Sequence, residues 1–182
     1  LARGELDEVE WERLVKVADR MMKTHLYFDD TSSTTVMDIR SRARRLKAEH
    51  GLDLIAIDYL QLIQAPGRVE NRTLAVAEMT RSLKILAREL NVPIVVLSQL
   101  SRATEGRSDK RPMLSDLRES GSIEQDADIV MFLYREDYYN QDTENANITE
   151  LSIAKHRNGA TDTIKMYFQK EYTRFRDLAR EP

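Results

Sequence analysis

Two short apolar runs separated by one long amphipathic stretch constrain the fold of this chain more than any other feature. The first run covers residues 54–57 and the second covers residues 94–97. Residues 73–90, between them, carry apolar side chains at the spacing of one helix face, and Pro93 prevents the helix from continuing. An unbroken apolar run is typical of a strand that is covered on both faces. The order strand, helix, strand therefore predicts parallel strands joined by a helix.

Capping signals predict two further helices before the first apolar run. Asp7, with a carboxylate three residues later, begins a capping-box pattern that is followed by apolar residues at helical spacing. Ser33 or Thr35 predicts the start of the second helix, and Gly51 predicts its end, because glycine tolerates the left-handed conformation found there. Residues 27–30 lie between these helices and predict a short strand.

Three more strands are predicted after the second apolar run. Residues 129–133 are apolar and should extend the parallel sheet. Residues 150–156 and 163–168 are joined around Asn158 and Gly159, a pattern typical of a hairpin that adds antiparallel strands at a sheet edge. The sequence therefore predicts an α/β fold with a mostly parallel sheet, helices that flank it and an antiparallel edge hairpin.

Composition limits the kinds of protein that this chain can be. Its 182 residues suffice for about one domain. Cysteine is absent and the three histidines are scattered, which excludes a disulfide framework and argues against a zinc site. No apolar run approaches the roughly 18 residues that cross a bilayer. The net charge of -3 gives no general indication of nucleic-acid binding, although a ring can bind a strand through a few loops.

Polar side chains follow the first two apolar runs. Asp58 comes directly after the first run, and Gln99 lies just beyond the second. Ligands bind at the carboxyl ends of parallel strands, so Asp58 could hold the magnesium ion that bridges the phosphates of ATP. The same carboxylate could simply cap the next turn, and its own segment leaves the two interpretations evenly balanced. Gln99 could hydrogen-bond a phosphate or a water molecule, or it could lie in an ordinary turn.

Two polar segments could contact phosphates in a different way. Residues 116–128 combine Arg118 with a small Ser-Gly turn, which could bring a guanidinium and backbone N–H groups to a nucleic-acid backbone. A solvated turn and helix would explain this composition without any function. Lys155 and Arg157 lie at the tip of the predicted hairpin, where solvating charges are the commoner case. They could instead reach a neighbouring subunit's nucleotide as an arginine finger.

Two other charged stretches are interpreted as solvated surface. Residues 137–147 are acidic and rich in asparagine, which predicts a solvated excursion. The cations of the second predicted helix wind around it, which favours solvation of that surface over a DNA-binding face. These cations are Arg40, Arg42, Arg44, Arg45 and Lys47.

Four stretches of the sequence occur in a characteristic order: IAIDYLQLI, NRTLAVAEMTRSLKILARELNVPIVVLSQLSR, DKRPMLSDLRESGSIEQDADIVMFLYR and KHRNG. In this order and spacing they resemble the C-terminal, RecA-like motor domain of the bacterial replicative helicase DnaB family, from near Leu1 to near Pro182. The resemblance implies a homo-hexameric ring that hydrolyses ATP with Mg²⁺ at subunit interfaces. It also implies 5'-to-3' translocation on single-stranded DNA, unwinding of duplex at the replication fork, and a cytoplasmic location in the bacterial nucleoid or replisome.

Matched by position, the resemblance implies a role for each candidate residue. Asp58 corresponds to the Walker B aspartate, which holds Mg²⁺ through water, and Gln99 corresponds to the polar residue that senses the γ-phosphate. The loop that contacts the DNA backbone corresponds to Arg118, Glu119 and Gly121. The cations that reach the neighbouring subunit's triphosphate correspond to Lys155 and Arg157.

The family's phosphate-binding loop is not found in this sequence. Walker A, G-x-x-x-x-G-K-[ST], cradles phosphates with backbone N–H groups and a lysine, and none of the six glycines here is followed by lysine. The catalytic glutamate and the N-terminal collar, which binds primase, are likewise expected before Leu1. We therefore expect residues 1–182 to form a partial RecA-like domain, incomplete at its N-terminus, that alone does not hydrolyse ATP at a helicase-like rate. Primase and the helicase loader are expected to bind the full-length protein.

Two other functions remain compatible with these residues. A RecA- or KaiC-like ATPase without unwinding activity would share the fold, although the segment SDLRESGSIEQDAD argues against it. A non-catalytic remnant that retains only ring-assembly or partner-binding surfaces would lack Walker A, as this sequence does. Retention of Asp58, Gln99, Lys155 and Arg157 argues against a remnant, because residues without a catalytic role have no reason to stay in register.

Overall fold

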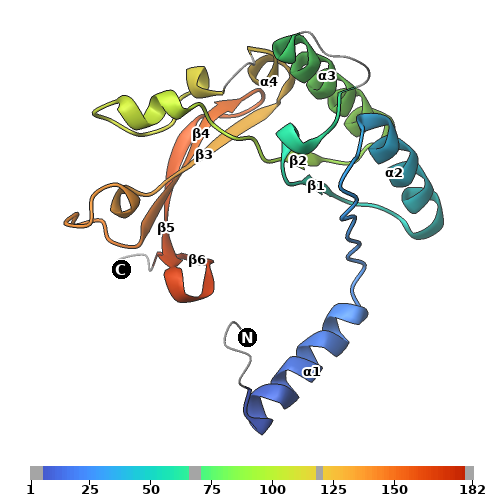
Figure 1. Ribbon diagram of the computed structural model, residues 1–182, viewed down its shortest axis with the longest axis horizontal. Coiled ribbons are helices and arrows are strands. Elements are labelled where there is room, and N and C mark those ends of the chain that lie inside the picture. The colour runs from blue at the N-terminus through green and yellow to red at the C-terminus, as the bar shows by residue number, and fades with distance from the viewer. Residues whose placement is uncertain (1–5, 66–70, 118–120, 179–182) are drawn as a thin grey trace. The chain divides into compact units, whose positions relative to one another are not determined.

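The computed structural model describes residues 6–65, 71–117 and 121–178. The chain divides into two compact units, Leu1–Ser32 and Ser33–Pro182. Helix α1 belongs to the first unit, and the other described helices and strands belong to the second (Figure 1). No helix of the described residues is long and apolar enough to cross a membrane.

Helix α1 spans Glu8–Met22 and confirms the first predicted helix. Its N-cap is Asp7, in the capping box that the sequence predicts. The strand predicted for residues 27–30 is not present, and that prediction is wrong. The carboxylate of Asp29 accepts hydrogen bonds from both the backbone N–H and the hydroxyl of Thr31. Such local side-chain bonds favour a turn over an extended strand.

Local signals also set the ends of the two long helices of the second unit. Helix α2 spans Val36–His50 and begins at Thr35, one of the two predicted caps, which forms a capping box of its own. Gly51 follows its last residue with a φ of 81°, which glycine adopts without a side-chain penalty. Helix α3 spans Arg72–Leu90 and ends at Asn91, whose φ of 47° is left-handed. The two predicted helices are therefore confirmed.

Cations of α2 bind the C-terminal end of α3. The Arg40 guanidinium lies 2.7 Å from the Glu89 carboxylate, and Arg44 also pairs with Glu89. The Lys47 ammonium donates to the carbonyl of Leu90. The hydrogen bond from Arg44 holds the pKa of Glu89 below its usual range, against the opposing effect of burial and with help from Arg40. The sequence favoured surface solvation over DNA binding for this cluster, and it did not predict that these three cations join two helices.

Strands β1 (Ile55–Ile57) and β2 (Ile94–Val96) pair in parallel, as the sequence predicts. Alternate side chains of both strands pack against α2 and α3 and form two hydrophobic clusters with them. The opposite face carries Val95 and Leu97, which are 44% and 52% exposed. The prediction that both faces of these strands are covered is wrong for the described residues, because both helices lie on the same face.

The remaining strands form an antiparallel sheet in the order β3-β4-β5-β6 (Figure 1). They span Ile129–Tyr134, Ile148–His156, Asp162–Gln169 and Arg174–Asp177. The hairpin predicted around Asn158 and Gly159 joins β4 to β5 and is confirmed. The strand predicted for residues 129–133 is β3, but it pairs with β4 instead of β2, because the chain turns back after it. The α/β class, with a parallel sheet, helices and antiparallel strands, is confirmed.

The short helix α4 spans Gly121–Asp126 and contacts both α3 and the antiparallel sheet. It packs against α3 and leads into β3 (Figure 1). Ile123 of α4 contacts a hydrophobic cluster around α3 and a second cluster that includes Val130 and Phe132 of β3. The Thr80 hydroxyl of α3 also donates to the Asp126 carboxylate at 2.6 Å. Helix α4 is therefore held by contacts with α3 and with the hydrophobic cluster of β3.

Candidate functional site

The ends of β1 and β2 bring Asp58 and Gln99 to the same edge of the parallel sheet. Backbone hydrogen bonds continue past the strands, since the Leu97 N–H donates to the Ile57 carbonyl at 2.9 Å. The Leu60 N–H in turn donates to the Leu97 carbonyl, also at 2.9 Å. Asp58 and Gln99 are both exposed. Two polar side chains therefore leave neighbouring strands at an edge that is open to solvent.

Gln61 connects the two strand ends, and the sequence alone did not single it out. Its side-chain amide donates to the Ser98 hydroxyl at 3.1 Å, and its side-chain oxygen accepts from the Gln99 N–H at 3.2 Å. Only the pairing of β1 with β2 shows that a glutamine after the first strand reaches the end of the second. By holding the backbone of Gln99, Gln61 fixes the direction in which the Gln99 side chain leaves the sheet.

Asp58 is the candidate ligand for a divalent cation at this edge. Mg²⁺ prefers oxygen ligands and is commonly held by one or two carboxylates, with waters and phosphates completing its shell. Within the ranges that the structure describes, no group of three or more Asp, Glu, His or Cys side chains could hold a metal ion. The Asp58 carboxylate is exposed and lies on the same edge as the Ser98 hydroxyl, so it is open to water and to a phosphate ligand.

Two of the three predicted DNA-contacting residues, Arg118 and Glu119, lie outside the described residues. The third, Gly121, is the exposed first residue of α4. The other end of this helix is held on α3 through Asp126, which accepts from Thr80. The end of the candidate DNA-contacting segment is therefore attached to the helix that also packs on the parallel sheet.

Lys155 and Arg157 meet the C-terminal end of α4. The Lys155 ammonium donates to the Glu124 carbonyl, and the Arg157 guanidinium donates to the Gln125 carbonyl at 3.2 Å. Carbonyls in the last turn of a helix have no backbone donor within the helix, so cations are favourable partners for them. The two predicted trans-acting cations therefore contact their own chain, although the sequence placed them at a projecting hairpin tip.

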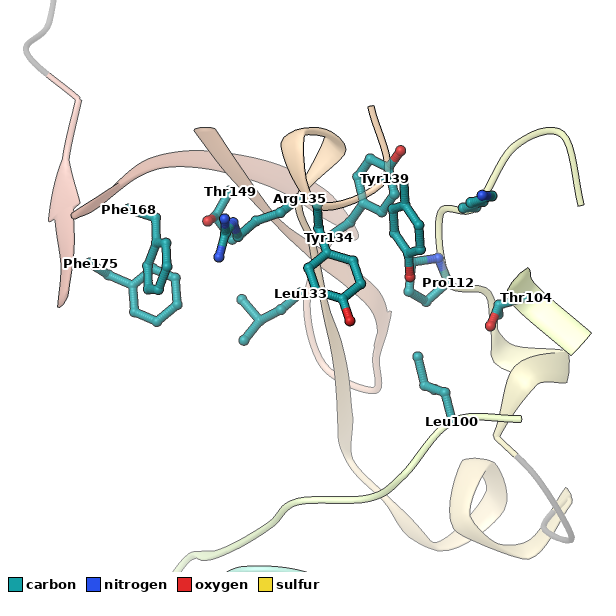
Figure 2. Close-up of a pocket in the computed structure, with 12 residues that line it drawn as sticks. Leu100, Thr104, Pro112, Leu133, Tyr134, Arg135, Tyr139, Thr149, Phe168 and Phe175 are labelled. Carbon is teal, nitrogen blue, oxygen red and sulfur yellow. The ribbon is translucent and has the colours of Figure 1, made fainter. Parts of the chain in front are cut away.

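A pocket of about 270 Å³ opens on the antiparallel sheet, and its walls are aromatic rings, apolar side chains and cations (Figure 2). The Arg135 guanidinium lies 4.3 Å from the centre of the Phe168 ring. The Tyr134 and Tyr139 rings stack with their centres 6.0 Å apart. Lys110 adds a second cation, 4.8 Å from the centre of the Tyr139 ring. Aromatic faces and cations of this kind suit a flat, ring-shaped ligand.

Asp137 fixes Arg135 beside this pocket. Its side chain is 3% exposed, and its carboxylate lies 3.1 Å from the Arg135 Nε and 2.7 Å from the Lys170 ammonium. It also accepts from the Asn147 N–H at 3.0 Å. Burial raises the pKa of Asp137, but these hydrogen bonds lower it more, so that it lies well below the usual range. The prediction that residues 137–147 are a solvated excursion is therefore wrong where this segment begins.

Comparisons with known proteins agree with the resemblance in the sequence. A family model for the DnaB-like helicase C terminal domain matches residues 1–177. The chain is 58% identical over 181 residues to the replicative DNA helicase DnaB of Geobacillus stearothermophilus. It is 55% identical over 181 residues to the replicative DNA helicase DnaC of Bacillus subtilis. Each match covers 99% of this chain and 40% of the relative, so the chain spans about two-fifths of the length of these curated relatives.

The solved structures that are similar to this chain include two helicase domains. One is described as an ATPase domain and matches with a TM-score of 0.92 and 44% identity, over 97% of this chain and 63% of that chain. A DnaB-like replicative helicase, described with its interactions with primase, matches with a TM-score of 0.91 and 44% identity. This second match covers 97% of this chain and 43% of that chain. The fold found here is therefore that of helicase ATPase domains.

Proposed function

This chain belongs to the DnaB-like helicase C-terminal domain family, and we propose that it forms part of the motor of an ATP-driven replicative DNA helicase. In this proposal the chain works in a homo-hexameric ring that translocates 5'-to-3' on single-stranded DNA and unwinds duplex at the bacterial replication fork. One observation carries the proposal: Asp58 and Gln99 share one open edge of the parallel sheet, where Gln61 joins the two strand ends.

The parallel-sheet edge supports a role in nucleotide hydrolysis. Asp58 would hold Mg²⁺ through water, and Gln99 would hydrogen-bond the γ-phosphate of ATP. When bound, Mg²⁺ neutralises charge on the phosphates of the nucleotide. The sequence has no G-x-x-x-x-G-K-[ST] loop, so these two residues are only part of the site that a working motor needs. The pocket beside Arg135 and Phe168 has the aromatic and cationic walls that suit a flat nucleobase.

Two further groups of residues fit a ring around DNA. Arg118, Glu119 and Gly121 would contact the backbone of the strand, because guanidinium and backbone N–H groups are common phosphate donors. Lys155 and Arg157 would stabilise the triphosphate bound by the neighbouring subunit. Primase and a helicase loader are proposed partners of the complete helicase, and one solved relative is described with primase.

A hybrid protein tests this function. In the hybrid, this chain replaces the matched segment of the Geobacillus stearothermophilus helicase. We expect ATP hydrolysis that is stimulated by single-stranded DNA, together with duplex unwinding. Asp58→Asn should lower kcat about a hundredfold, because a neutral side chain holds the magnesium ion poorly. Asp53→Asn changes an exposed carboxylate just before β1 and should leave kcat within about twofold of the parent hybrid.

The two alternative functions give different results in the same hybrid. A RecA- or KaiC-like ATPase would hydrolyse ATP without unwinding duplex DNA. A non-catalytic remnant would assemble and bind partners but would show no DNA-stimulated turnover, under conditions in which the parental helicase is fully active. Either result would contradict the proposed function.

A further inference from the structure

Three cations and one carboxylate meet where α4 ends and β3 begins. Lys155 and Arg157 donate to carbonyls in the last turn of α4. Asp128 lies between α4 and β3 and forms ion pairs with Arg157 and with Lys84 of α3. The Arg157 N–H also donates to the Asp128 carbonyl at 2.8 Å, which fixes the distance between the two backbones. The Arg157 side chain therefore starts from a well-defined position beside the carboxylate.

The two ion pairs of Asp128 differ in kind. Lys84 pairs through a direct hydrogen bond, and its side chain is only 20% exposed. The Arg157 Nε lies 3.6 Å from Asp128 Oδ1, which is an electrostatic contact longer than a hydrogen bond. The hydrogen bond from Lys84 lowers the pKa of Asp128, burial opposes this effect, and the charges of Arg157 and Arg88 lower the pKa further. The carboxylate is therefore ionised beside the guanidinium at neutral pH.

Asp128 can affect the orientation of the Arg157 guanidinium more than it affects folding stability. The Asp128 side chain is 53% exposed, and ion pairs in contact with solvent contribute little to folding. The guanidinium is nevertheless held from two directions, since the Gln125 carbonyl binds one terminal nitrogen and Asp128 faces the Nε. A guanidinium is a planar fork of donors, and it stabilises a phosphate only when that fork points at the phosphate oxygens.

We propose that Asp128 is a positioning residue that aims the Arg157 guanidinium. The inference rests on the proposed function, in which Arg157 acts on the triphosphate bound by the neighbouring subunit. A purely structural role for Asp128 is the alternative, because its ion pair with Lys84 ties α3 to the junction of α4 and β3. The two roles predict different effects when each partner of that ion pair is changed.

Two variants of the hybrid break the same ion pair from opposite sides. Asp128→Asn removes the charge that faces Arg157, whereas Lys84→Gln removes the cation and leaves that charge in place. Asp128→Asn should lower kcat about tenfold and leave the KM for ATP within about twofold, because positioning affects the reacting complex more than nucleotide binding. Lys84→Gln should leave kcat within about twofold.

A second measurement reports on Arg157 without turnover. Phenylglyoxal modifies arginine side chains, and the rate at Arg157 can be followed by peptide mass spectrometry of the intact hybrid without nucleotide. Asp128→Asn should raise this rate about threefold, because the guanidinium loses the carboxylate that holds it. Lys84→Gln should leave the rate unchanged.

The outcomes separate the inference from its premise. Equal kcat and equal modification rates in the two variants would overturn the positioning role. A higher kcat in Asp128→Asn would also overturn it, because the contact would then restrain Arg157 instead of aiming it. Arg157→Ala should lower kcat about a thousandfold, and Asp128→Asn should add no further loss to it. Full activity of Arg157→Ala would refute the trans-acting role of Arg157, and it would do so whatever Asp128→Asn shows.

Discussion

At the scale of single residues, Asp137 shows how one buried carboxylate holds several segments together. Its partners come from three places in the antiparallel sheet: Arg135 directly after β3, Asn147 before β4 and Lys170 after β5. Because the carboxylate is almost completely buried, its negative charge is stable only while these donors are present. Asp137 therefore determines where the Arg135 guanidinium lies over the Phe168 ring.

Asp137→Asn should destabilise the chain by about 2 kcal/mol at pH 7, since it leaves two cations beside a neutral amide. The folded state lowers the pKa of Asp137, so its contribution to stability is fully present above the unfolded pKa of about 4. The contribution is lost as the pH falls through the folded pKa. Urea unfolding of the chain and its variant should therefore show a difference at pH 7 that shrinks at about pH 3.

An exposed aspartate of the same segment provides the control for this measurement. Asp142→Asn should change the free energy of unfolding by less than about 0.5 kcal/mol at either pH. If Asp137→Asn behaved like Asp142→Asn, the buried cluster would contribute nothing to stability. If its effect were the same at both pH values, the effect would come from packing rather than from charge.

The positions of single polar residues were only partly predictable from the sequence. Asp58 and Gln99 could be placed at one sheet edge, because a strand-helix-strand order brings the carboxyl ends of parallel strands together. The contacts of Gln61 with Ser98, of Asp128 with Lys84 and of Asp137 with Lys170 could not be predicted, because these partners are distant in the sequence. A local pattern does not show which distant charges become neighbours.

At the scale of elements, both ion pairs between α2 and α3 share one carboxylate, that of Glu89. Glu89→Gln removes the partner of both Arg40 and Arg44, and it should lower the Tm by about 2–5 °C. The loss should be smaller in 1 M salt, because the Debye length falls to about 3 Å and ion pairs in contact with solvent become weaker. Glu78→Gln, an exposed change on the same helix, should leave the Tm nearly unchanged. Equal Tm values for the two variants would show that the ion pairs of Glu89 do not stabilise the contact between the helices.

Elements with local signals were predictable, whereas their partners were not. Capping residues and a hairpin turn act within a few residues of the chain, so the helices and the β4–β5 hairpin were placed correctly. The partner of β3 depends on where the chain turns after it, and the uncovered face of β1 and β2 depends on which side two separate helices pack. The strand partner and the uncovered face both depend on contacts between distant parts of the chain, which an apolar run in the sequence does not predict.

At the scale of the whole molecule, the proposed ring divides each catalytic site between two subunits. Asp58 lies at the edge of the parallel sheet, whereas Arg157 is held at the end of α4, beside the antiparallel sheet. In the proposed function the first residue serves the nucleotide of its own subunit and the second serves the nucleotide of the neighbour. Rings that contain two different defective subunits can therefore contain intact sites.

Mixed rings of the hybrid test this division. Asp58→Ala and Arg157→Ala should each abolish turnover in uniform rings, but an equal mixture should recover up to about a quarter of the parental rate, because about one interface in four pairs an intact Asp58 with an intact Arg157. A mixture of Asp58→Ala with Asp58→Asn contains no intact interface and should recover nothing. If the first mixture also recovered nothing, with subunit exchange verified by native mass spectrometry, both residues would serve the nucleotide of the same subunit. The contact of Arg157 with its own α4 would then be the geometry in which it acts.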